Sequence, residues 1–351
     1  METGSFARYL SVTAATTAVL LTAVAGINWL VDPLWNAGGN KLFGQNYSFN
    51  ERHAKINLLL DQGADRFDCV IFGSSRATLL NHHHIRSHRC FNLSFSDATP
   101  VEMAAFARYV RKLGLRPRRA IIAVDERNFS RRHLAEVIPE FVREGTPPPS
   151  RWSVWLSLDT LDFSLRTLLR RPPRPRYYDS RFIGRVVPGT PPYRIRDCYS
   201  AEDRGRPYTT RHLRFYREIM AAFPKAEWAG YAPLISAWDM AVLAEDGSLA
   251  SYLDTQYAVS RLFTRYFDFS VPSPLTTDPA NGYDGQHFLP RINDHIVHAL
   301  ETGESPYGLA LHRLTREEYG RRFKHALEEF RRTHRVKLRL SPECGRRPVI
   351  R

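Results

Sequence analysis

The sequence predicts an α/β fold with a parallel sheet, preceded by an apolar N-terminal helix. Short apolar runs alternate with segments of helical periodicity between positions 67 and 300, which is the pattern of α/β proteins. The run Ala120–Val124 is apolar without interruption, as expected for a strand covered on both faces of a parallel sheet. Tyr9–Val31 contains no charged residue and is long enough to cross the ~30 Å hydrocarbon core of a membrane. The 351 residues, 43% of them hydrophobic, can bury a full α/β core with room for an insertion.

The N-terminal segment allows several interpretations. The small residues around Ala23–Gly26 would suit a cleavable signal peptide, and a buried core helix is a third possibility. We favour an uncleaved single-pass anchor because the apolar stretch is longer than a usual signal core. Arg8 precedes it, which favours a cytoplasmic N-terminus and places the main domain outside the cytoplasm, in the periplasm or on the outer face of the inner membrane. We therefore expect an anchor or signal segment at 1–35, an α/β domain at 36–308, and a charged helix and tail at 309–351.

The elements follow in order along the chain. A loop and a short amphipathic helix around Ile56–Leu60 come first. Strands are predicted from apolar runs at Phe67–Phe72, Cys90–Phe95, Ala120–Val124, Trp228–Leu234 and Phe267–Ser270. Helices are predicted from their periodicity at Val101–Leu113 (stopped by Gly114), Thr210–Phe223, Ala250–Tyr266, Pro290–Leu300 and Leu314–Arg332.

Between about Arg131 and Tyr208 the alternation breaks. Clusters of proline and arginine interrupt this region, and short helices are predicted only near Trp152–Leu169. We interpret it as an insertion that forms a lid or a partner surface. A disordered loop is the alternative.

The formal net charge of +14 would attract nucleic acid, anionic lipid or an acidic polysaccharide. A general bias of composition explains the arginine excess equally well. Because no zinc-ligand spacing, ribonucleoprotein aromatic motif or clear helix-turn-helix is present, we expect no nucleic-acid partner.

We also expect no metal and no cofactor. The four cysteines, Cys69, Cys90, Cys198 and Cys344, form no CxxC pair. The adjacent His82–His84 would point in different directions on a helix and cannot all bind one ion. Cys69 and Cys90 lie in predicted buried strands, where cysteine commonly acts as a small apolar residue. An extracytoplasmic location permits disulfides, but no pairing follows from the sequence.

The most informative motif is Gly73-Ser74-Ser75-Arg76, directly after the first predicted strand. A second motif, Asp284-Gly285-Gln286-His287, precedes the last helix of the α/β region. A serine at the carboxyl end of a parallel strand lies at the edge where ligands bind. A serine nucleophile needs a base and a group that orients this base, which His287 and Asp284 would supply. The structural alternatives are that Ser75 or Ser74 caps a helix and that His287 is an ordinary surface residue.

These motifs resemble the SGNH (GDSL-type) hydrolase superfamily. The Gly-Ser-Ser-Arg block, Asn92-Leu93-Ser94 and Thr99-Pro100 are similar to its membrane-anchored branch, which includes the D-alanyl transfer protein of teichoic acids and the alginate O-acetylation proteins. The resemblance implies a flavodoxin-like three-layer α/β/α fold. It makes Ser75 the nucleophile, His287 the base and Asp284 the orienting acid.

The sequence departs from the family pattern in the oxyanion blocks. Where the family has a glycine, this chain has Ser96-Asp97-Ala98, and the Asn128 side chain is the one available in the third block. The oxyanion candidates are therefore the amide of Ser75, Asp97 and Asn128. Arg76 is a candidate for holding an anionic substrate group. The alternative, which we favour, is that Arg76 pairs with an acidic residue on the helix face, and Asp97 and Glu126 could pair with such arginines.

The expected function is that of a serine esterase or O-acyltransferase. The resemblance implies removal or transfer of an acetyl group on cell-envelope or exported polysaccharide, with a membrane-bound acyl donor protein as a possible partner. The alternative is an inactive SGNH-like envelope protein that binds glycan or scaffolds a partner.

Overall fold

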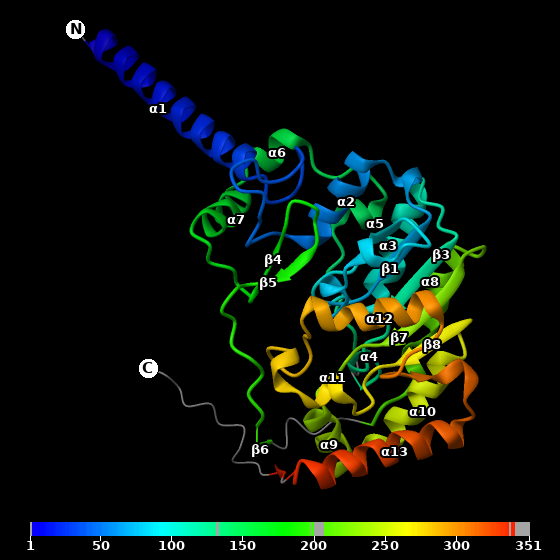
Figure 1. Ribbon diagram of the computed structural model, residues 1–351. Helices are drawn as coiled ribbons and strands as arrows, with labels where there is room; N and C mark the ends of the chain where they lie inside the picture. Colours follow the sequence, from blue (N-terminus) through cyan, green and yellow to red (C-terminus); the bar gives the residue numbers. More distant parts are fainter. Residues whose placement is uncertain (1, 131–132, 197, 200–206, 337, 341–351) are drawn as a thin grey trace. The chain divides into compact units, whose positions relative to one another are not determined.

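A computed structural model describes residues 2–130, 133–196, 198–199, 207–336 and 338–340 (Figure 1). The chain forms two compact units. Unit 1 comprises the residues up to Gly63 together with Pro139–Val187, and unit 2 comprises Ala64–Ile138 together with the chain from Pro188 onward. The predicted tail beyond Leu340, with Cys344, lies outside the described residues.

Unit 2 is built on a mostly parallel six-stranded sheet in the order β2-β1-β3-β7-β8-β9. The first five strands of this order are parallel, and β9 is antiparallel to β8. The bounds are β1 Cys69–Phe72, β2 Cys90–Asn92, β3 Arg119–Ala123, β7 Glu227–Ala232, β8 Arg265–Asp268 and β9 Leu309–Ala310. Without β9, this is the strand order of flavodoxin-like doubly wound sheets, whose ligands bind between the carboxyl ends of the first and third strands.

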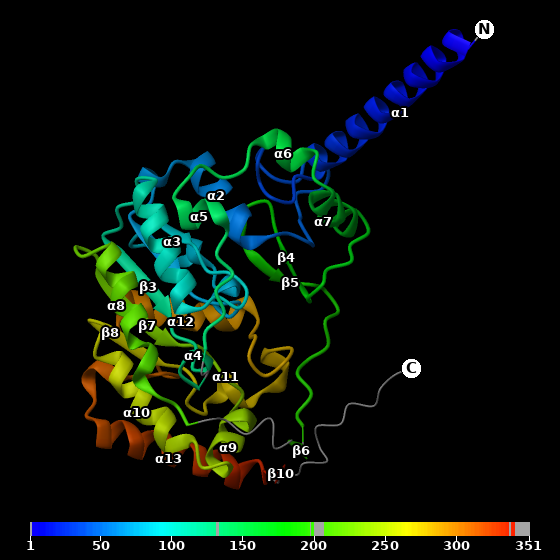
Figure 2. The same ribbon diagram turned by 180° about the vertical axis from the view of Figure 1, so that it is seen from behind.

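Helices cover both faces of the sheet. Alternate strand residues such as Ile71 and Ile121 form one core with Ile292 and Ile296 of helix α12, because successive side chains of a strand point to opposite faces. Figure 1 shows α12 across this face, and Figure 2 shows α3, α8 and α10 on the other. The helices of unit 2 from eight residues upward are α3 Pro100–Lys112, α8 Leu213–Ala222, α9 Ala237–Glu245, α10 Leu249–Ser260, α12 Pro290–Thr302 and α13 Arg316–Thr333. Shorter elements are α4 Arg127–Ser130, α11 Pro274–Thr277, β6 Cys198–Tyr199 and β10 Arg339–Leu340. The arrangement is compatible with a three-layer α/β/α fold.

The five predicted strands and most predicted helices of this unit are confirmed, with shifted ends. The helix predicted at Ala250–Tyr266 was too long, because the chain already enters β8 at Arg265. The helix expected directly after Ser75 is only a 3₁₀ turn, Ala77–Leu79. Helix α9 and strand β9 were not predicted, since neither has a distinct periodic pattern.

Unit 1 contains the apolar N-terminal helix α1, Glu2–Val31. Its segment Ser5–Val31 is long and apolar enough to cross a membrane. Part of the predicted insertion belongs to this unit and is folded, with helices and a β-hairpin in place of a disordered loop. The other elements are α2 Glu51–Gln62, α5 Glu140–Glu144, α6 Arg151–Trp155, α7 Leu158–Leu168, β4 Arg176–Tyr178 and β5 Gly184–Val186.

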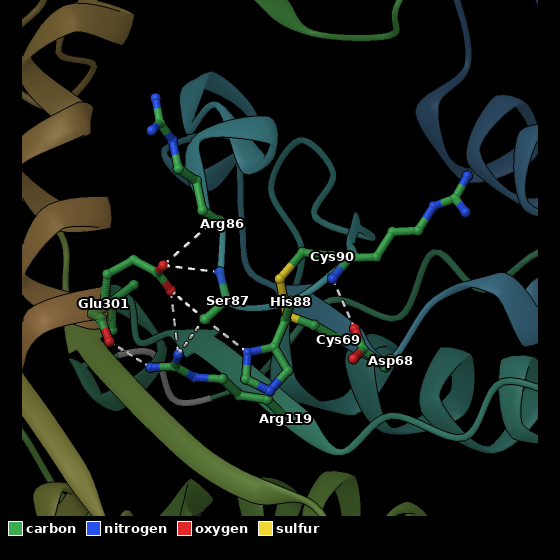
Figure 3. The surroundings of a disulfide bond; sticks show 10 residues. Asp68, Cys69, Arg86, Ser87, His88, Cys90, Arg119 and Glu301 are labelled. Carbon is green, nitrogen blue, oxygen red and sulfur yellow. Dashed lines mark hydrogen bonds and ion pairs between the residues drawn. A yellow bond between two sulfur atoms is a disulfide. The ribbon is translucent and has the colours of Figure 1, made fainter.

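A disulfide joins Cys69 and Cys90, which are paired positions of the neighbouring strands β1 and β2. The interpretation of these cysteines as small apolar residues was therefore wrong. Figure 3 shows Glu301 of α12 accepting hydrogen bonds from the backbone N–H groups of Arg86 and Ser87, in the loop that leads to Cys90. Cys69 is the first residue of β1, so the disulfide lies at the sheet edge opposite to the end of β1 that carries Ser75.

Replacement of both Cys69 and Cys90 by alanine is expected to lower the free energy of unfolding by about 2–4 kcal/mol. The disulfide closes a loop over a sequence separation of 21 and so reduces the entropy of the unfolded chain. Urea unfolding in detergent, with and without reductant, measures the effect. Reduced wild type should match the double variant, and an unchanged midpoint after both thiols have been shown to be free would contradict the prediction.

Candidate functional site

Close packing fixes the turn that carries Ser75. A side chain at Gly73 would place its Cβ 2.6 Å from Cβ of Ala77 and 2.8 Å from Cβ of Ala123, so only glycine fits there. The hydroxyl of Ser75 lies 2.7 Å from Nε2 of His287. Ser74 accepts the backbone N–H of Arg76 at 3.4 Å.

Asp284 holds His287 from the same loop. Its Oδ2 lies 2.7 Å from His287 Nδ1, and its Oδ1 accepts the backbone N–H groups of Gln286 and His287. The ring of Tyr283 stacks on the imidazole, with centroids 5.3 Å apart. Because the carboxylate accepts a hydrogen at Nδ1, Nε2 is left to accept the hydroxyl hydrogen of Ser75.

The pKa of Asp284 is lowered. Burial opposes its ionisation, but the hydrogen bond and the charge of His287, together with the two loop amides, outweigh this effect. Asp284 therefore stays a carboxylate at neutral pH and can stabilise a protonated His287.

A small cavity of about 40 Å³ adjoins these groups. Ser75, His287, Asp97 and Asn128 are among the residues that line it. Asn128 is 2% exposed, and its side chain is within hydrogen-bonding reach of the buried Tyr216 hydroxyl. A buried amide donor that lines a cavity beside a serine hydroxyl can bind an oxygen that gains negative charge.

Asp97 occupies the region where the family pattern has glycine. Its φ of 53° is in the left-handed region, which aspartate tolerates better than most residues. Asp97 thus adopts a backbone conformation that glycine favours, and its exposed side chain lies at the rim of the cavity. The structure therefore brings all three oxyanion candidates to one cavity.

Arg76 forms a buried ionic network. Its guanidinium makes two hydrogen bonds with Glu126, at 2.6 and 2.8 Å, and its Nε lies 3.2 Å from Asp125. Its Nη2 also donates to Gln286 Oε1 at 3.0 Å. All three side-chain nitrogens of Arg76 are thus bonded within the protein, while Arg76 is also among the residues that line the cavity beside Ser75, and its contact with substrate stays a prediction. Pairing of Arg76 with Glu126, one of the predicted alternatives, is present in the structure.

The two carboxylates of this network have opposite pKa shifts. Burial opposes ionisation of Glu126, but the charge and hydrogen bonds of Arg76 outweigh it, so the Glu126 pKa is lowered. For Asp125, burial outweighs the attraction of Arg76 and the pKa is raised.

Two further residues brace the Asp284–His287 loop, and the sequence analysis missed both. The backbone N–H of Tyr193 donates to the carbonyls of Pro279 and Gly282. The hydroxyl of Tyr193 lies 3.3 Å from Oδ1 of Asp239. Both side chains pack against Gly285 so closely that a Cβ there would lie 2.9 Å from Asp239 Oδ2. Tyr193 lies in a proline-rich stretch without periodicity, so no local pattern signals its role.

Replacement of Asp239 by asparagine is expected to stabilise the protein at neutral pH. Burial, opposed by Arg196, raises the pKa of Asp239 to about 6, so the folded state binds its proton more tightly than the unfolded state. This group's contribution to stability is present below pH 4 and is lost as the pH rises through 6. The asparagine variant should match wild type near pH 3.5 and exceed it by up to about 3 kcal/mol at pH 7.5. Urea unfolding across this range measures it, and a constant difference would contradict the prediction.

The described residues thus bring Ser75, His287 and Asp284 into one hydrogen-bonded chain at the carboxyl end of β1. The buried amide of Asn128 completes the same cavity. Arg76 lines this cavity as well and forms the buried ionic network with Glu126 and Asp125. No protein-family model matches the chain, and no curated protein matches it.

Proposed function

We propose that the chain is a membrane-anchored serine esterase or O-acyltransferase of the SGNH type. The observation that carries the proposal is the chain of 2.7 Å contacts from Asp284 through His287 to Ser75. A serine, a base and an orienting acid in this order perform nucleophilic acyl transfer.

In the proposed reaction, Ser75 Oγ attacks the carbonyl carbon of an ester while its proton passes to His287 Nε2. Asp284 stabilises the imidazolium. The carbonyl oxygen becomes negatively charged and is stabilised by Asn128 Nδ2 and backbone amides. His287 then protonates the leaving alcohol as the ester bond breaks. An acyl-serine remains. Water or a sugar hydroxyl attacks its carbonyl carbon while the proton of the attacking group passes to His287 Nε2, and the acyl–Oγ bond then breaks as His287 returns this proton to Ser75.

The cavity supports a small acyl group. A volume of about 40 Å³ corresponds to only a few water molecules, which suits an acetyl group better than a long chain. Together with the family resemblance, this favours acetyl esters of cell-envelope or exported polysaccharide as substrates. A membrane-bound protein is a possible acyl donor.

The proposed location is outside the cytoplasm, with α1 as a single-pass anchor. The apolar segment Ser5–Val31 supports the anchor. The Cys69–Cys90 disulfide supports an oxidising compartment, because disulfides are rare in the cytosol.

A fluorophosphonate serine probe tests the proposal on the full chain in detergent. Labelling is expected for wild type and for Ser74→Ala, and it should be lost in Ser75→Ala and His287→Ala. If correctly folded wild type is not labelled, the chain is better described as an inactive SGNH-like envelope protein that binds glycan or scaffolds a partner.

A further inference from the structure

Helix α7 of unit 1 buries a face of small polar residues and exposes leucines, the reverse of a usual surface helix. Its buried residues are Thr160, Ser164 and Thr167, which lie on one helical face because they are four and three positions apart. The hydroxyl of Ser164 donates to Asn28 of α1 at 2.9 Å. Thr167 accepts the backbone N–H groups of two residues in the segment before α2. Small polar side chains at a helix contact are typical of helix packing in membranes.

The opposite face of α7 is exposed and apolar. Leu158 and Leu169 are 73% and 62% exposed, and Leu165 lies between them on the same face. On the adjoining α6, Trp152 is 69% exposed. A helix at the surface of a soluble protein normally turns its leucines inward, and a large exposed apolar patch marks an interaction site. The α6–α7 apolar surface consists of Trp152, Leu156, Leu158, Leu165, Leu168 and Leu169.

This surface lies beside the C-terminal end of α1 (Figure 1). Asn28, fully buried near that end, donates its Nδ2 hydrogens to the carbonyls of Trp155 and Ser157, at 2.8 and 3.1 Å. The 27-residue segment Ser5–Val31 extends about 40 Å, which exceeds the ~30 Å hydrocarbon core. The last turns of a spanning α1 would therefore lie in the headgroup region, and α6 and α7 are hydrogen-bonded to those turns.

The charges around the surface favour lipid headgroups. The exposed arginines on α6, on α7 and just after it are Arg151, Arg166, Arg170, Arg171 and Arg174. Of the two exposed aspartates on α7, Asp162 is paired with Arg166 at 2.8 Å. An apolar face bordered by basic residues is typical of helices that lie in a membrane interface, where anionic headgroups attract arginine.

We propose that the α6–α7 apolar surface inserts into the lipid bilayer next to α1, with its arginines at anionic headgroups. The inference rests on the proposed membrane anchoring by α1. It makes unit 1 a body seated in the interface and held by two contacts, a spanning helix and an interfacial surface.

Photocrosslinking in membranes of cells that express the full chain tests this proposal. Benzoylphenylalanine replaces Trp152, Leu158 or Leu165, all exposed side chains whose substitution should not disturb folding. Leu60 of α2, an exposed leucine of the same unit outside the surface, is the matched control. After irradiation, mass spectrometry is expected to find about tenfold more phospholipid adduct at the three positions than at position 60.

Other adducts would overturn the proposal. Crosslinks to another protein would show that the surface binds a protein partner. Equal amounts of lipid adduct at position 60 would show that the α6–α7 apolar surface does not contact lipid preferentially. A Leu158→Glu, Leu165→Glu double variant should lose most of the adduct at position 152 while Ser75 is still labelled by the fluorophosphonate.

A carbonate wash of the same membranes separates the two claims. A chain that resists extraction without lipid adducts refutes the inference alone, whereas a chain that is extracted refutes the anchor as well. Loss of probe labelling at Ser75 would instead count against the proposed esterase chemistry and not against the membrane contact of unit 1.

Discussion

Replacement of His287 by alanine is expected to lower kcat for an activated acetyl ester by about 10⁶-fold, as large as the loss from Ser75→Ala. His287 Nε2 lies 2.7 Å from the Ser75 hydroxyl oxygen, so His287→Ala removes the base that would take the proton of Ser75. Asp284→Asn should cost about 10⁴-fold, because an amide stabilises the imidazolium poorly and can present the wrong partner to Nδ1. Hydrolysis of p-nitrophenyl acetate by the full chain in detergent measures both values.

Two variants separate the chemical roles. Ser74→Ala should keep nearly full activity, since His287 Nε2 contacts the hydroxyl of Ser75, whereas the Ser74 hydroxyl bonds the backbone N–H of Arg76 and the carboxylate of Asp125. Asn128→Ala should retain Ser75 labelling but lower kcat by about 10²–10³-fold, the usual effect of losing one oxyanion donor. Equal losses from Ser74→Ala and His287→Ala would contradict the assignment of Ser75 as the nucleophile.

Local patterns in the sequence predicted the elements that carry the site. The apolar run before Ser75 and the run Ala120–Val124 before Asn128 predict neighbouring buried strands, and parallel strands end at one edge of a sheet. His287 precedes a helix whose start at Pro290 is also readable locally. The segments that carry Ser75, Asn128 and His287 are therefore predicted to meet at one edge of the sheet, even though the strand order is not known from the sequence.

Long-range choices could not be predicted in the same way. The residues next to Arg76 in the sequence do not show whether it pairs with Glu126 or faces a ligand, because this depends on how the end of β3 lies beside the end of β1. The disulfide depends on the register that places Cys69 opposite Cys90. The leucine spacing in α7 predicts a short helix with an apolar face. It does not show whether that face is buried in the protein or exposed.

Arg76→Met is expected to lower the free energy of unfolding by about 3–5 kcal/mol at pH 7. The variant leaves Glu126 and Asp125, which are 7% and 5% exposed, buried without their cation. It also removes the hydrogen bond from Arg76 to Gln286, which ties the Ser75 turn to the loop of His287. Urea unfolding of the full chain in detergent measures the stability, and fluorophosphonate labelling should fall because one of the hydrogen bonds that join the two loops is lost.

The pH dependence distinguishes this loss from a packing defect. In wild type the lowered pKa of Glu126 contributes stability that is present above its unfolded value of about 4.5 and is lost on acidification. In Arg76→Met, burial is opposed by the smaller effects of Arg127 and a backbone hydrogen bond and raises that pKa, so the deficit relative to wild type should grow from pH 4 to pH 7. The matched double variant Arg76→Met, Glu126→Gln removes the stranded charge and should recover part of the stability at pH 7. A deficit that is equal at both pH values and unchanged by Glu126→Gln would show that the guanidinium acts through packing, and the ionic network would then not be what supports the Ser75 turn.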